Sequence, residues 1–425
     1  MSAAEPQVLP ELRQVLGAGA VNAGLELAPG PPGALTDAEA RRAAAGWGLA
    51  QAADRTPGDG GGTVVVLVDG LGLEQLRERR GHAPTLRSWL STAQMSAGPG
   101  PAAVTCRPST TAAAITTLGT GALPGVTGMV GYSVLNPLQR RELPAGTVPG
   151  PGQNLSLITW EGTAPDPRSW QDVPTIFERL VDPLARAGAS SRQPLAVTIG
   201  PARFAGSGLT EAALRGATHI GADRMEDRPA LAAAALRRGV PLVYLYVGEL
   251  DHTGHAHGWR SARWLEQLER LDTAMAELLR RVPRGTQILL SADHGMIDTG
   301  PTWRIDLSEV PELRRDVAAL AGEPRLSQLY VTGSDEGLAA EVARRWREHL
   351  GERALWVGTR QEAAAHLGPM GERARSVVGD VLVAMAGAWV VVDPRVHSEG
   401  AIAMPGVHGS FTDAEMVVPL LTAVA

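Results

Sequence analysis

The chain has 425 residues, which is enough for two or three domain-sized units, and its 44% apolar and 20% charged residues are ordinary for a globular enzyme. All 39 basic residues are arginine. Because the net charge is −6 and no basic run marks a nucleic-acid face, these figures argue against a protein that binds duplex nucleic acid.

The sequence also limits where the protein is expected to work. Cys106 is the single cysteine, so no intrachain disulfide can form. Residues 1–19 contain Glu5, Glu11 and Arg13 where a signal peptide would need an apolar core, and no apolar run is long enough for a membrane span. We therefore expect a cytoplasmic protein with no membrane partner. Since no heptad pattern argues for association, we expect a monomer.

In chain order, the predicted elements form an α/β fold. Residues 1–60 are rich in Ala, Gly and Pro, and we expect them to form a segment with short helices that packs on the core. Short apolar, β-branched runs predict buried parallel strands at residues 63–68, 194–199, 242–247 and 287–290. Helical patterns separate the strands, the clearest at residues 261–281, where an apolar stripe is typical of a core-facing helix. This alternation predicts a mostly parallel central sheet flanked by helices.

The pattern changes between residues 302 and 378. A strand at 329–332, an amphipathic helix at 336–350 and a strand at 355–357 indicate an α+β lobe. We expect this lobe to be inserted in a catalytic α/β domain formed by residues 61–301 and 379–425.

Three aspartates stand at or just past the ends of predicted strands: Asp69, Asp251 and Asp293. Ligands of parallel sheets collect beyond the carboxyl ends of the strands. These aspartates are therefore expected to converge.

Histidines accompany two of these aspartates. Asp251 and His255 are four residues apart, which places both on one face of a helical turn, and His294 directly follows Asp293. Each motif alone is weak, and His408 between glycines would alone be a surface residue. Together with Asp69, however, they supply the carboxylates and imidazoles that two adjacent divalent cations need.

A hydroxyl-rich segment, residues 108–111, precedes an Ala-rich helical stretch. A hydroxyl at the first turn of a helix faces free N–H groups and the positive end of the helix dipole, which stabilise an alkoxide. An ordinary N-cap is the commoner use of such a residue. The metal set elsewhere in the chain favours a nucleophile.

Other conspicuous side chains have simpler explanations. His252 and His257 are expected on the surface or behind the ligands, and Cys106 as a small buried side chain. Trp160 and Trp170 are expected to pack in the core, and a base-stacking role for Trp160 is the alternative.

These motifs, in this order from about residue 63 to 410, resemble the type I phosphodiesterase / nucleotide pyrophosphatase branch of the alkaline phosphatase superfamily. The resemblance implies an alkaline-phosphatase-like fold with one metal held by Asp69, Thr111, Asp293 and His294. It implies a second metal held by the remaining three ligands, Asp251, His255 and His408. Thr111 corresponds to the nucleophile, with Thr110 the candidate if the alignment shifts by one residue. Where extracellular members carry an Asn that holds a phosphate oxygen, this chain has Tyr132, whose hydroxyl is the candidate replacement.

The expected function is a metal-dependent phosphodiesterase that hydrolyses a nucleotide, using two Mn²⁺ or Zn²⁺ ions. A Lys-free, Ala/Arg-rich chain suggests a GC-rich bacterium, and bacterial cytosolic members of this branch include cyclic dinucleotide phosphodiesterases. Cyclic di-AMP, cleaved to pApA and then AMP, is therefore the expected substrate.

The alternatives are a phosphomonoesterase or phosphonate hydrolase of the same superfamily, and a non-catalytic nucleotide-binding module. A sulfatase is disfavoured because Thr110 stands where its nucleophile motif needs an arginine. A non-catalytic module should have lost metal ligands, and all seven are present.

Overall fold

The computed structural model describes residues 9–49, 61–95, 100–138, 153–162, 164–182, 193–333 and 336–425. Its main part is built around a six-stranded sheet in the order β20-β10-β2-β9-β7-β8. The strands are β2 (Thr63–Val68), β7 (Ala196–Gly200), β8 (Thr218–Gly221), β9 (Leu242–Val247), β10 (Gln287–Ser291) and β20 (Leu421–Val424). Only β20, at one edge, runs antiparallel to its neighbour. The predicted mostly parallel sheet is confirmed.

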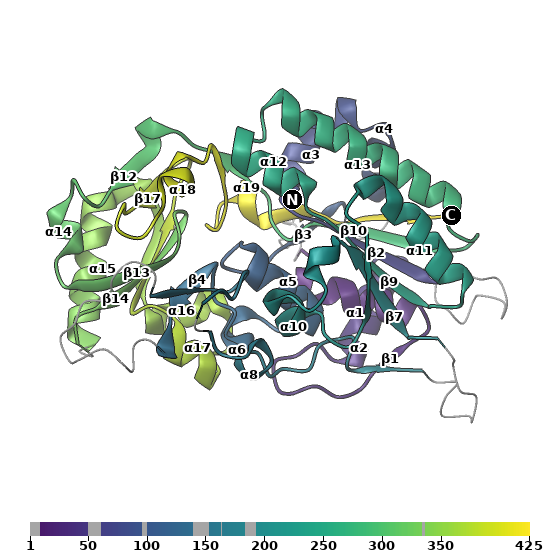
Figure 1. Cartoon of the computed structure of the whole chain (residues 1–425), viewed down its shortest axis with the longest axis horizontal. Helices are drawn as coiled ribbons and strands as arrows, with labels where there is room; N and C mark the ends of the chain where they lie inside the picture. Colours follow the sequence, from purple (N-terminus) through teal and green to yellow (C-terminus); the bar gives the residue numbers. More distant parts are fainter. Residues whose placement is uncertain are drawn as a thin grey trace, which may run out of the picture.

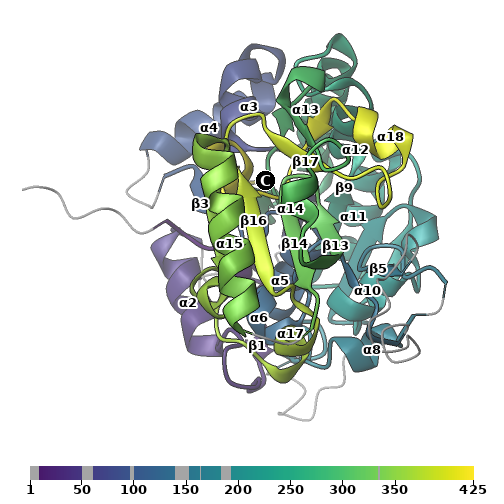
Figure 2. The same cartoon turned by 90° about the vertical axis from the view of Figure 1, so that its left-hand side faces the viewer.

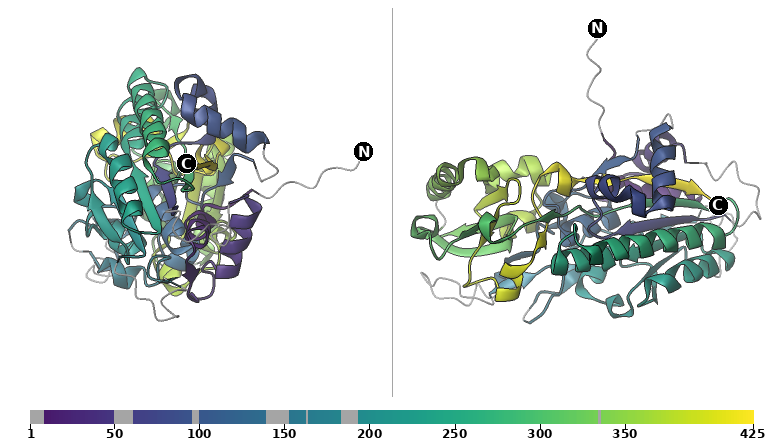
Figure 3. Two further views of the ribbon diagram at one scale, coloured as in Figure 1. Left: turned by 90° about the vertical axis from the view of Figure 1, so that its right-hand side faces the viewer. Right: turned by 90° about the horizontal axis from the view of Figure 1, so that it is seen from above.

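Three of the inner strands, β10, β2 and β9, are short apolar runs with almost every residue buried. Strands of this kind form where helices cover both faces of a sheet. Here α1 (Leu12–Asn22) packs on β2 and β10, and α11 (Arg228–Arg237) packs on β7 and β9. The left panel of Figure 3 shows the α11/α13 layer and the α1/α2 layer on opposite sides of the strands. The helices expected near residues 10–16 and 37–45 are therefore part of this cover, as α1 and α2 (Asp37–Gly46).

The long helix α13 (Ala262–Arg281) buries the apolar stripe that its sequence predicts, from Trp264 to Leu278. The other helices of this part are α3 (Leu73–Arg79), α4 (Pro84–Met95), α5 (Thr111–Thr120), α6 (Pro124–Thr127), α8 (Pro167–Trp170), α10 (Gly208–Ala213), α12 (Glu249–His257) and α19 (Asp413–Met416). Short strand pairs complete it: β1 (Glu26–Leu27) with β6 (Leu180–Val181), and β3 (Ala102–Val104) with β19 (Val417–Pro419).

A second lobe lies beyond the carboxyl ends of the main strands (Figure 1, left). Its antiparallel sheet has the order β13-β14-β16-β15, formed by β13 (Val317–Glu323), β14 (Leu326–Val331), β15 (Ala354–Thr359) and β16 (Val381–Met385). The helix α15 (Glu336–Leu350) covers one face of this sheet and stands in front of it in Figure 2. The remaining elements here are β11 (Ile297–Asp298), β12 (Arg304–Asp306), α14 (Pro311–Arg314), α16 (Arg360–Leu367), α17 (Glu372–Val377), β17 (Val390–Val392), α18 (Glu399–Ala403) and β18 (Gly406–Val407).

The lobe sheet extends past the boundary that the sequence suggested. We expected the lobe to end at residue 378, but β16 is an inner strand of its sheet and β17 pairs with β12. The apolar run at residues 381–385 is equally suited to a strand of either sheet, so its sequence alone does not assign it. A hairpin of β4 (Ser133–Leu135) and β5 (Asn154–Ser156) contacts β13 and so links the two parts.

Among the helices of the described residues, none is both long and apolar enough to cross a bilayer.

Candidate metal centre

Two buried aspartates mark the carboxyl ends of the adjacent strands β2 and β10. Asp69 directly follows β2, and Asp293 lies two residues beyond β10, whose Ser291 pairs with Leu67. The N–H groups of Gly70 and His294 donate to Asp293 Oδ1 at 3.1 and 2.9 Å. Each aspartate therefore has one anchored oxygen and one free oxygen: Asp69 Oδ1 and Asp293 Oδ2 are buried without a hydrogen-bond partner.

Thr111 reaches this pair from the helix α5. It is the first residue of α5, and its hydroxyl oxygen lies 3.1 Å from Nε2 of His294. The same Nε2 lies 3.4 Å from Asp69 Oδ1 and 3.4 Å from Asp293 Oδ2. The neighbouring Thr110 is the N-cap residue and makes no capping bond with its side chain. The geometry thus brings Thr111 to the aspartates at the amino end of a helix.

The other three predicted ligands form a second group. Asp251 and His255 lie on one face of α12, with Asp251 Oδ1 3.3 Å from His255 Nε2 and 3.7 Å from His408 Nε2. Asp251 Oδ1 is buried and has no hydrogen-bond partner. A glycine at position 254 is required because a Cβ there would meet Met296 Sδ at 2.3 Å. This close approach lets α12 pack against β18, the strand that leads to His408.

All three histidines present the same nitrogen to the cluster. Their Nδ1 atoms contact backbone carbonyl oxygens: His255 that of Gly406 at 2.8 Å, His294 that of Gly295 at 2.9 Å and His408 that of Ser109 at 2.9 Å. A carbonyl oxygen only accepts, so Nδ1 must carry the proton and Nε2 has a free lone pair. This is the arrangement that orients imidazoles as metal ligands. The ring of His408 stacks on that of His294 with centroids 3.5 Å apart.

Burial and the neighbouring charges shift the pKa values of three residues of the cluster. Burial, followed by the charges of Asp293 and Asp251, raises the pKa of Asp69 well above its usual value. Burial also raises the pKa of Asp293. Burial, and then the neighbouring His294 and His255, hold the pKa of His408 well below its usual value. Divalent cations would reverse this destabilisation of the carboxylates, since they favour ionised aspartates and neutral imidazoles.

The seven residues fit two adjacent cations. Two groups have ligand atoms within 4.8 Å of one another, namely Asp251 with His255 and His408, and Asp69 with Asp251 and His294. Because Asp251 belongs to both groups, the two positions are neighbours. Three unpartnered carboxylate oxygens and three unprotonated Nε2 atoms supply hard and borderline ligands without thiolate, which suits Zn²⁺ or Mn²⁺.

Sequence reasoning missed two supports of this centre. The hydroxyl of Tyr246, on β9, donates to Asp69 Oδ2 at 2.5 Å. A tyrosine hydroxyl in an otherwise apolar central strand usually finds a hydrogen-bond partner, so the run LVYLYV contained a usable signal, although only Tyr246 of its two tyrosines has such a partner.

The second support joins the lobe to the metal ligands. Arg325, between β13 and β14, forms a fully buried two-pronged ion pair with Glu415, at 3.0 and 2.6 Å. Glu415 also accepts the N–H of Ser410, and its carbonyl oxygen accepts the N–H of Gly295. Glu415 therefore braces the segments that follow both His408 and His294. No local sequence pattern indicates such a pair.

The two residues suggested for substrate contact lie in different surroundings. The ring of Tyr132 is exposed, and its N–H donates to Glu323 Oε2 at 2.8 Å, on the lobe. Trp160 is buried, donates its ring N–H to the carbonyl of Leu157 and packs edge-on against Trp170 at 5.7 Å. This placement agrees with the core-packing interpretation of both tryptophans.

The structure also places His252, His257 and Cys106. His252 and His257 are exposed on α12. Cys106 is buried, which raises the pKa of its thiol to about 12. It is therefore an inert packing residue.

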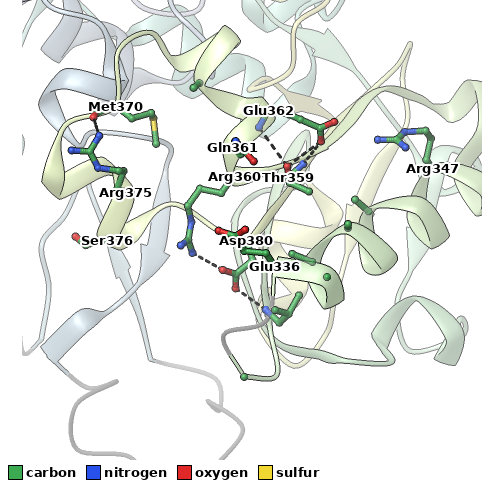
Figure 4. Close-up of a pocket in the computed structure, with 17 residues that line it drawn as sticks. Glu336, Arg347, Thr359, Arg360, Gln361, Glu362, Met370, Arg375, Ser376 and Asp380 are labelled. Atoms are coloured by element: carbon green, nitrogen blue, oxygen red, sulfur yellow. Dashed lines mark hydrogen bonds and ion pairs between the residues drawn. The ribbon is translucent and has the colours of Figure 1, made fainter.

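The lobe contains a separate cavity of about 1040 Å³ (Figure 4). Its charged side chains are largely paired with neighbours: Arg360 with Asp380, and Arg375 with the carbonyl of Met370. It contains none of the seven predicted ligands. The chemistry is therefore concentrated at the strand ends of the main sheet.

Comparisons with known proteins agree with this geometry. No curated protein sequence matches the chain significantly. Phosphonoacetate hydrolase from Sinorhizobium meliloti 1021, in complex with phosphonoformate, has a similar structure: 18% identity, coverage of 85% of this chain and 89% of that chain, and a TM-score of 0.60. An inactive threonine-to-alanine variant of murine ectonucleotide pyrophosphatase / phosphodiesterase 5, in complex with AMP, shows 15% identity, 85% and 87% coverage and a TM-score of 0.58. The human protein shows 15% identity, the same coverage and a TM-score of 0.55.

At these identities the similar structures establish the fold alone, an α/β fold with a mostly parallel central sheet. Residues 63–410 match the sequence model of the type I phosphodiesterase / nucleotide pyrophosphatase family, and this stretch includes every residue of the metal centre. The chain therefore belongs to the type I phosphodiesterase / nucleotide pyrophosphatase family.

Proposed function

We propose that this protein is a two-metal phosphodiesterase that cleaves a nucleotide phosphodiester with Thr111 as the nucleophile. The observation that carries the proposal is the position of the Thr111 hydroxyl, 3.1 Å from a histidine Nε2 at the amino end of α5. The buried, unpartnered oxygens of Asp69 and Asp293 are the adjacent ligands for a cation. The inactive threonine-to-alanine variant of the murine neighbour supports a threonine in this role.

Asp69, Asp293, His294 and Thr111 would hold one divalent cation, and Asp251, His255 and His408 the other. The carboxylate of Asp251 lies close enough to both positions to serve both cations. Bound Mn²⁺ or Zn²⁺ would supply Lewis-acid stabilisation of phosphate charge and lower the pKa of a bound hydroxyl or water. The metal-ligand and nucleophile assignments rest on the arrangement of these side chains around shared Asp251.

The chain's own groups then perform two successive displacements at phosphorus. The Thr111 oxygen forms a bond to phosphorus while the bond to the leaving oxygen breaks; the hydroxyl proton passes to solvent and the leaving oxygen takes up a proton from solvent. The free N–H groups at the start of α5 face the phosphoryl oxygens and stabilise their charge. Water then attacks the phosphothreonine from the side of Asp251, His255 and His408, which releases the nucleotide and restores the Thr111 hydroxyl.

Cyclic di-AMP is the substrate that we propose, opened to pApA and cleaved onward to AMP. This choice rests on the family and on the composition of the chain. We also propose that the protein acts in the cytoplasm as a monomer. Tyr132 is exposed beside the lobe and is the proposed phosphate or nucleotide contact, whereas the burial of Trp160 leaves it a packing role.

Replacement of Thr111 tests the mechanism. Thr111→Ala should lower kcat for bis-p-nitrophenyl phosphate by at least about a thousand-fold, because it removes the nucleophile. Metal content, measured by elemental analysis, should fall by much less than kcat. Thr110→Ala is the matched control, since it makes the same change one residue earlier. Wild-type kcat in Thr111→Ala, or a loss confined to Thr110→Ala, would show that the nucleophile is assigned wrongly.

The substrate needs its own measurement. Mn²⁺-loaded protein is incubated with cyclic di-AMP, pApA, cyclic mononucleotides, p-nitrophenyl phosphate and phosphonoacetate, and the products are separated by chromatography. We expect pApA followed by AMP from cyclic di-AMP. Brisk cleavage of phosphonoacetate or a monoester, with cyclic di-AMP untouched, would replace the substrate while retaining the two-metal site.

A further inference from the structure

Arg107 stands apart from the other charged side chains around the metal centre. It lies four residues before Thr111, in the segment that joins β3 to α5, and is half-buried. Its Nε is buried and has no hydrogen-bond partner. Within the stretches that the structure describes, Arg107 also forms no ion pair. By contrast, the buried Arg179 and Arg215 donate their Nε–H to a carbonyl oxygen and to a carboxylate, respectively.

The surroundings of Arg107 are aromatic. Its guanidinium carbon lies 5.5 Å from the ring centroid of Phe411. Phe411 lies 5.0 Å from His366 on α16, and His366 lies 4.6 Å from Trp356 on β15. All three rings are partly exposed, and two come from the lobe. Arg107 therefore lies where the nucleophile segment meets the lobe.

Hydrogen bonds join this place to the metal centre. The segments around Ser109 and residues 408–411 run together: the Ser109 hydroxyl donates to the carbonyl of Ser410 at 2.6 Å, and the Ser109 carbonyl accepts from His408 Nδ1. Along the chain, Arg107 lies two residues before Ser109 and Thr111 lies two residues after it. His408 lies two residues before Ser410, and Phe411 directly follows it. Four residues of chain span at most about 14 Å, which is within the reach of one nucleotide-sized ligand.

An unpaired, half-buried guanidinium is costly, because it has lost part of its hydration without gaining an acceptor. The aromatic face compensates only in part, because a ring face attracts a cation more weakly than a charged acceptor does. A ligand with a charged oxygen group would supply the missing acceptors, and a guanidinium binds phosphate or carboxylate with two parallel hydrogen bonds.

We propose that Arg107 binds a second anionic group of the substrate, a phosphate or a carboxylate, beside the group that Thr111 attacks. This proposal rests on the proposed function, and it predicts that the preferred substrates carry a charge beyond the reacting phosphorus. The second phosphate of a dinucleotide and the carboxylate of a phosphonocarboxylate share this chemistry. Arg107 would thus select the substrate, with Phe411 keeping its side chain in place.

Binding, rather than turnover, tests the role of Arg107 directly. Metal-loaded Thr111→Ala protein is titrated calorimetrically with pApA and ApA, which differ by one phosphate, and with phosphonoacetate and methylphosphonate, which differ by one carboxylate. We expect the anion-bearing member of at least one pair to bind more tightly. Addition of Arg107→Ala should reduce that preference by about 10- to 100-fold, since a hydrogen bond to a charged group contributes about 1.5–3 kcal/mol.

Arg353→Ala is the matched control, because Arg353 also lies 5.5 Å from an aromatic ring, that of Trp389, and is not part of this cluster. It should leave the preference unchanged. Arg107→Gln is the second variant if Arg107→Ala does not fold, and thermal unfolding identifies that case.

The outcomes separate this inference from the proposed function. Loss of preference in only one pair identifies the anion as phosphate or as carboxylate. Retained preference in the Arg107 variants, equal weakening of both members of each pair, or no preference in either pair contradicts the proposal. If wild-type protein cleaves no phosphodiester but Arg107 still determines the anion preference, the proposed reaction fails and the binding site stands.

Discussion

The two halves of the metal centre are held in different ways. The side chains of Asp69, Asp293 and His294 are 4%, 0% and 0% exposed and project from the ends of adjacent central strands. Those of Asp251 and His255 are 15% and 28% exposed and lie on a helix. His408, which completes the second half, lies on a loop braced from the lobe.

This difference indicates that the sheet preorganises the first half, whereas packing of separate elements assembles the second. Backbone N–H groups and Tyr246 orient the buried aspartates before any cation binds. His408 depends on the Ser109 carbonyl and on the Arg325–Glu415 pair. The second half should therefore be the more easily weakened by distant substitutions.

The largest effect is expected from the residue that the halves share. Asp251→Asn should remove both cations and reduce kcat/KM by at least about a thousand-fold, because a neutral amide replaces the carboxylate common to both groups. His255→Ala should remove only one cation equivalent. Elemental analysis after dialysis measures both, with His252→Ala, an exposed change on the same helix, as the control. Loss of one equivalent in both variants would contradict the shared role of Asp251.

Arg325→Met should destabilise the folded chain by about 3–5 kcal/mol, since it leaves the buried Glu415 carboxylate without its partner. The metal affinity of the second half, which contains His408, should fall more than that of the first half, which contains Asp69 and Asp293. Denaturant unfolding and metal titration measure the two effects. Arg344→Met, which removes an exposed arginine, should change stability by less than about 1 kcal/mol. Similar losses in both variants would show that the buried pair has no special role.

Tyr246→Phe should weaken metal binding by about 10- to 100-fold, because Asp69 loses the donor that orients it. Tyr244→Phe is the natural control on the same strand, since the Tyr244 hydroxyl is buried without a hydrogen-bond partner. Competition with a chelator gives the affinities. Equal metal affinities for the two variants would show that the Tyr246 hydroxyl does not support the half of the centre formed by Asp69, Asp293 and His294.

The smallest expected effect is a pH-dependent change in Tm caused by Glu323 of the lobe. Burial raises the pKa of Glu323, beside Gly409, from 4.5 to about 8. The folded chain therefore binds more protons than the unfolded chain between these values, and the contribution of Glu323 to stability is lost as pH rises through this window. In the metal-free protein, Glu323→Gln should raise Tm relative to the wild type at pH 8.5 and change it less at pH 5. A Tm difference independent of pH would show that Glu323 does not titrate in this window.

Local patterns predicted the strand half well. The run TVVVLV before Asp69 and the run before Asp293 are buried strands as expected, and parallel strands necessarily bring their ends together. The spacing of Asp251 and His255 likewise predicted their shared helical face. In each case the pattern that predicts the structure is contained in a few consecutive residues.

Contacts between distant segments were not predictable in this way. The Arg325–Glu415 pair joins residues 90 positions apart, and Arg107 lies over Phe411, whose ring contacts His366 of the lobe. Neither contact leaves a periodic pattern or a fixed spacing in the sequence, because each contact depends on how the lobe packs on the main sheet. The same reason explains why β16 was placed outside the lobe.

We propose that seven side chains, including that of Thr111, hold two neighbouring cations. Crystals grown with Mn²⁺ and measured for anomalous scattering test it most directly. We predict two peaks in each chain, one bound by Asp69, Asp293 and His294 and the other by Asp251, His255 and His408, at about 2.0–2.2 Å from their ligand atoms. A single peak, or peaks bound by other residues, would contradict this account.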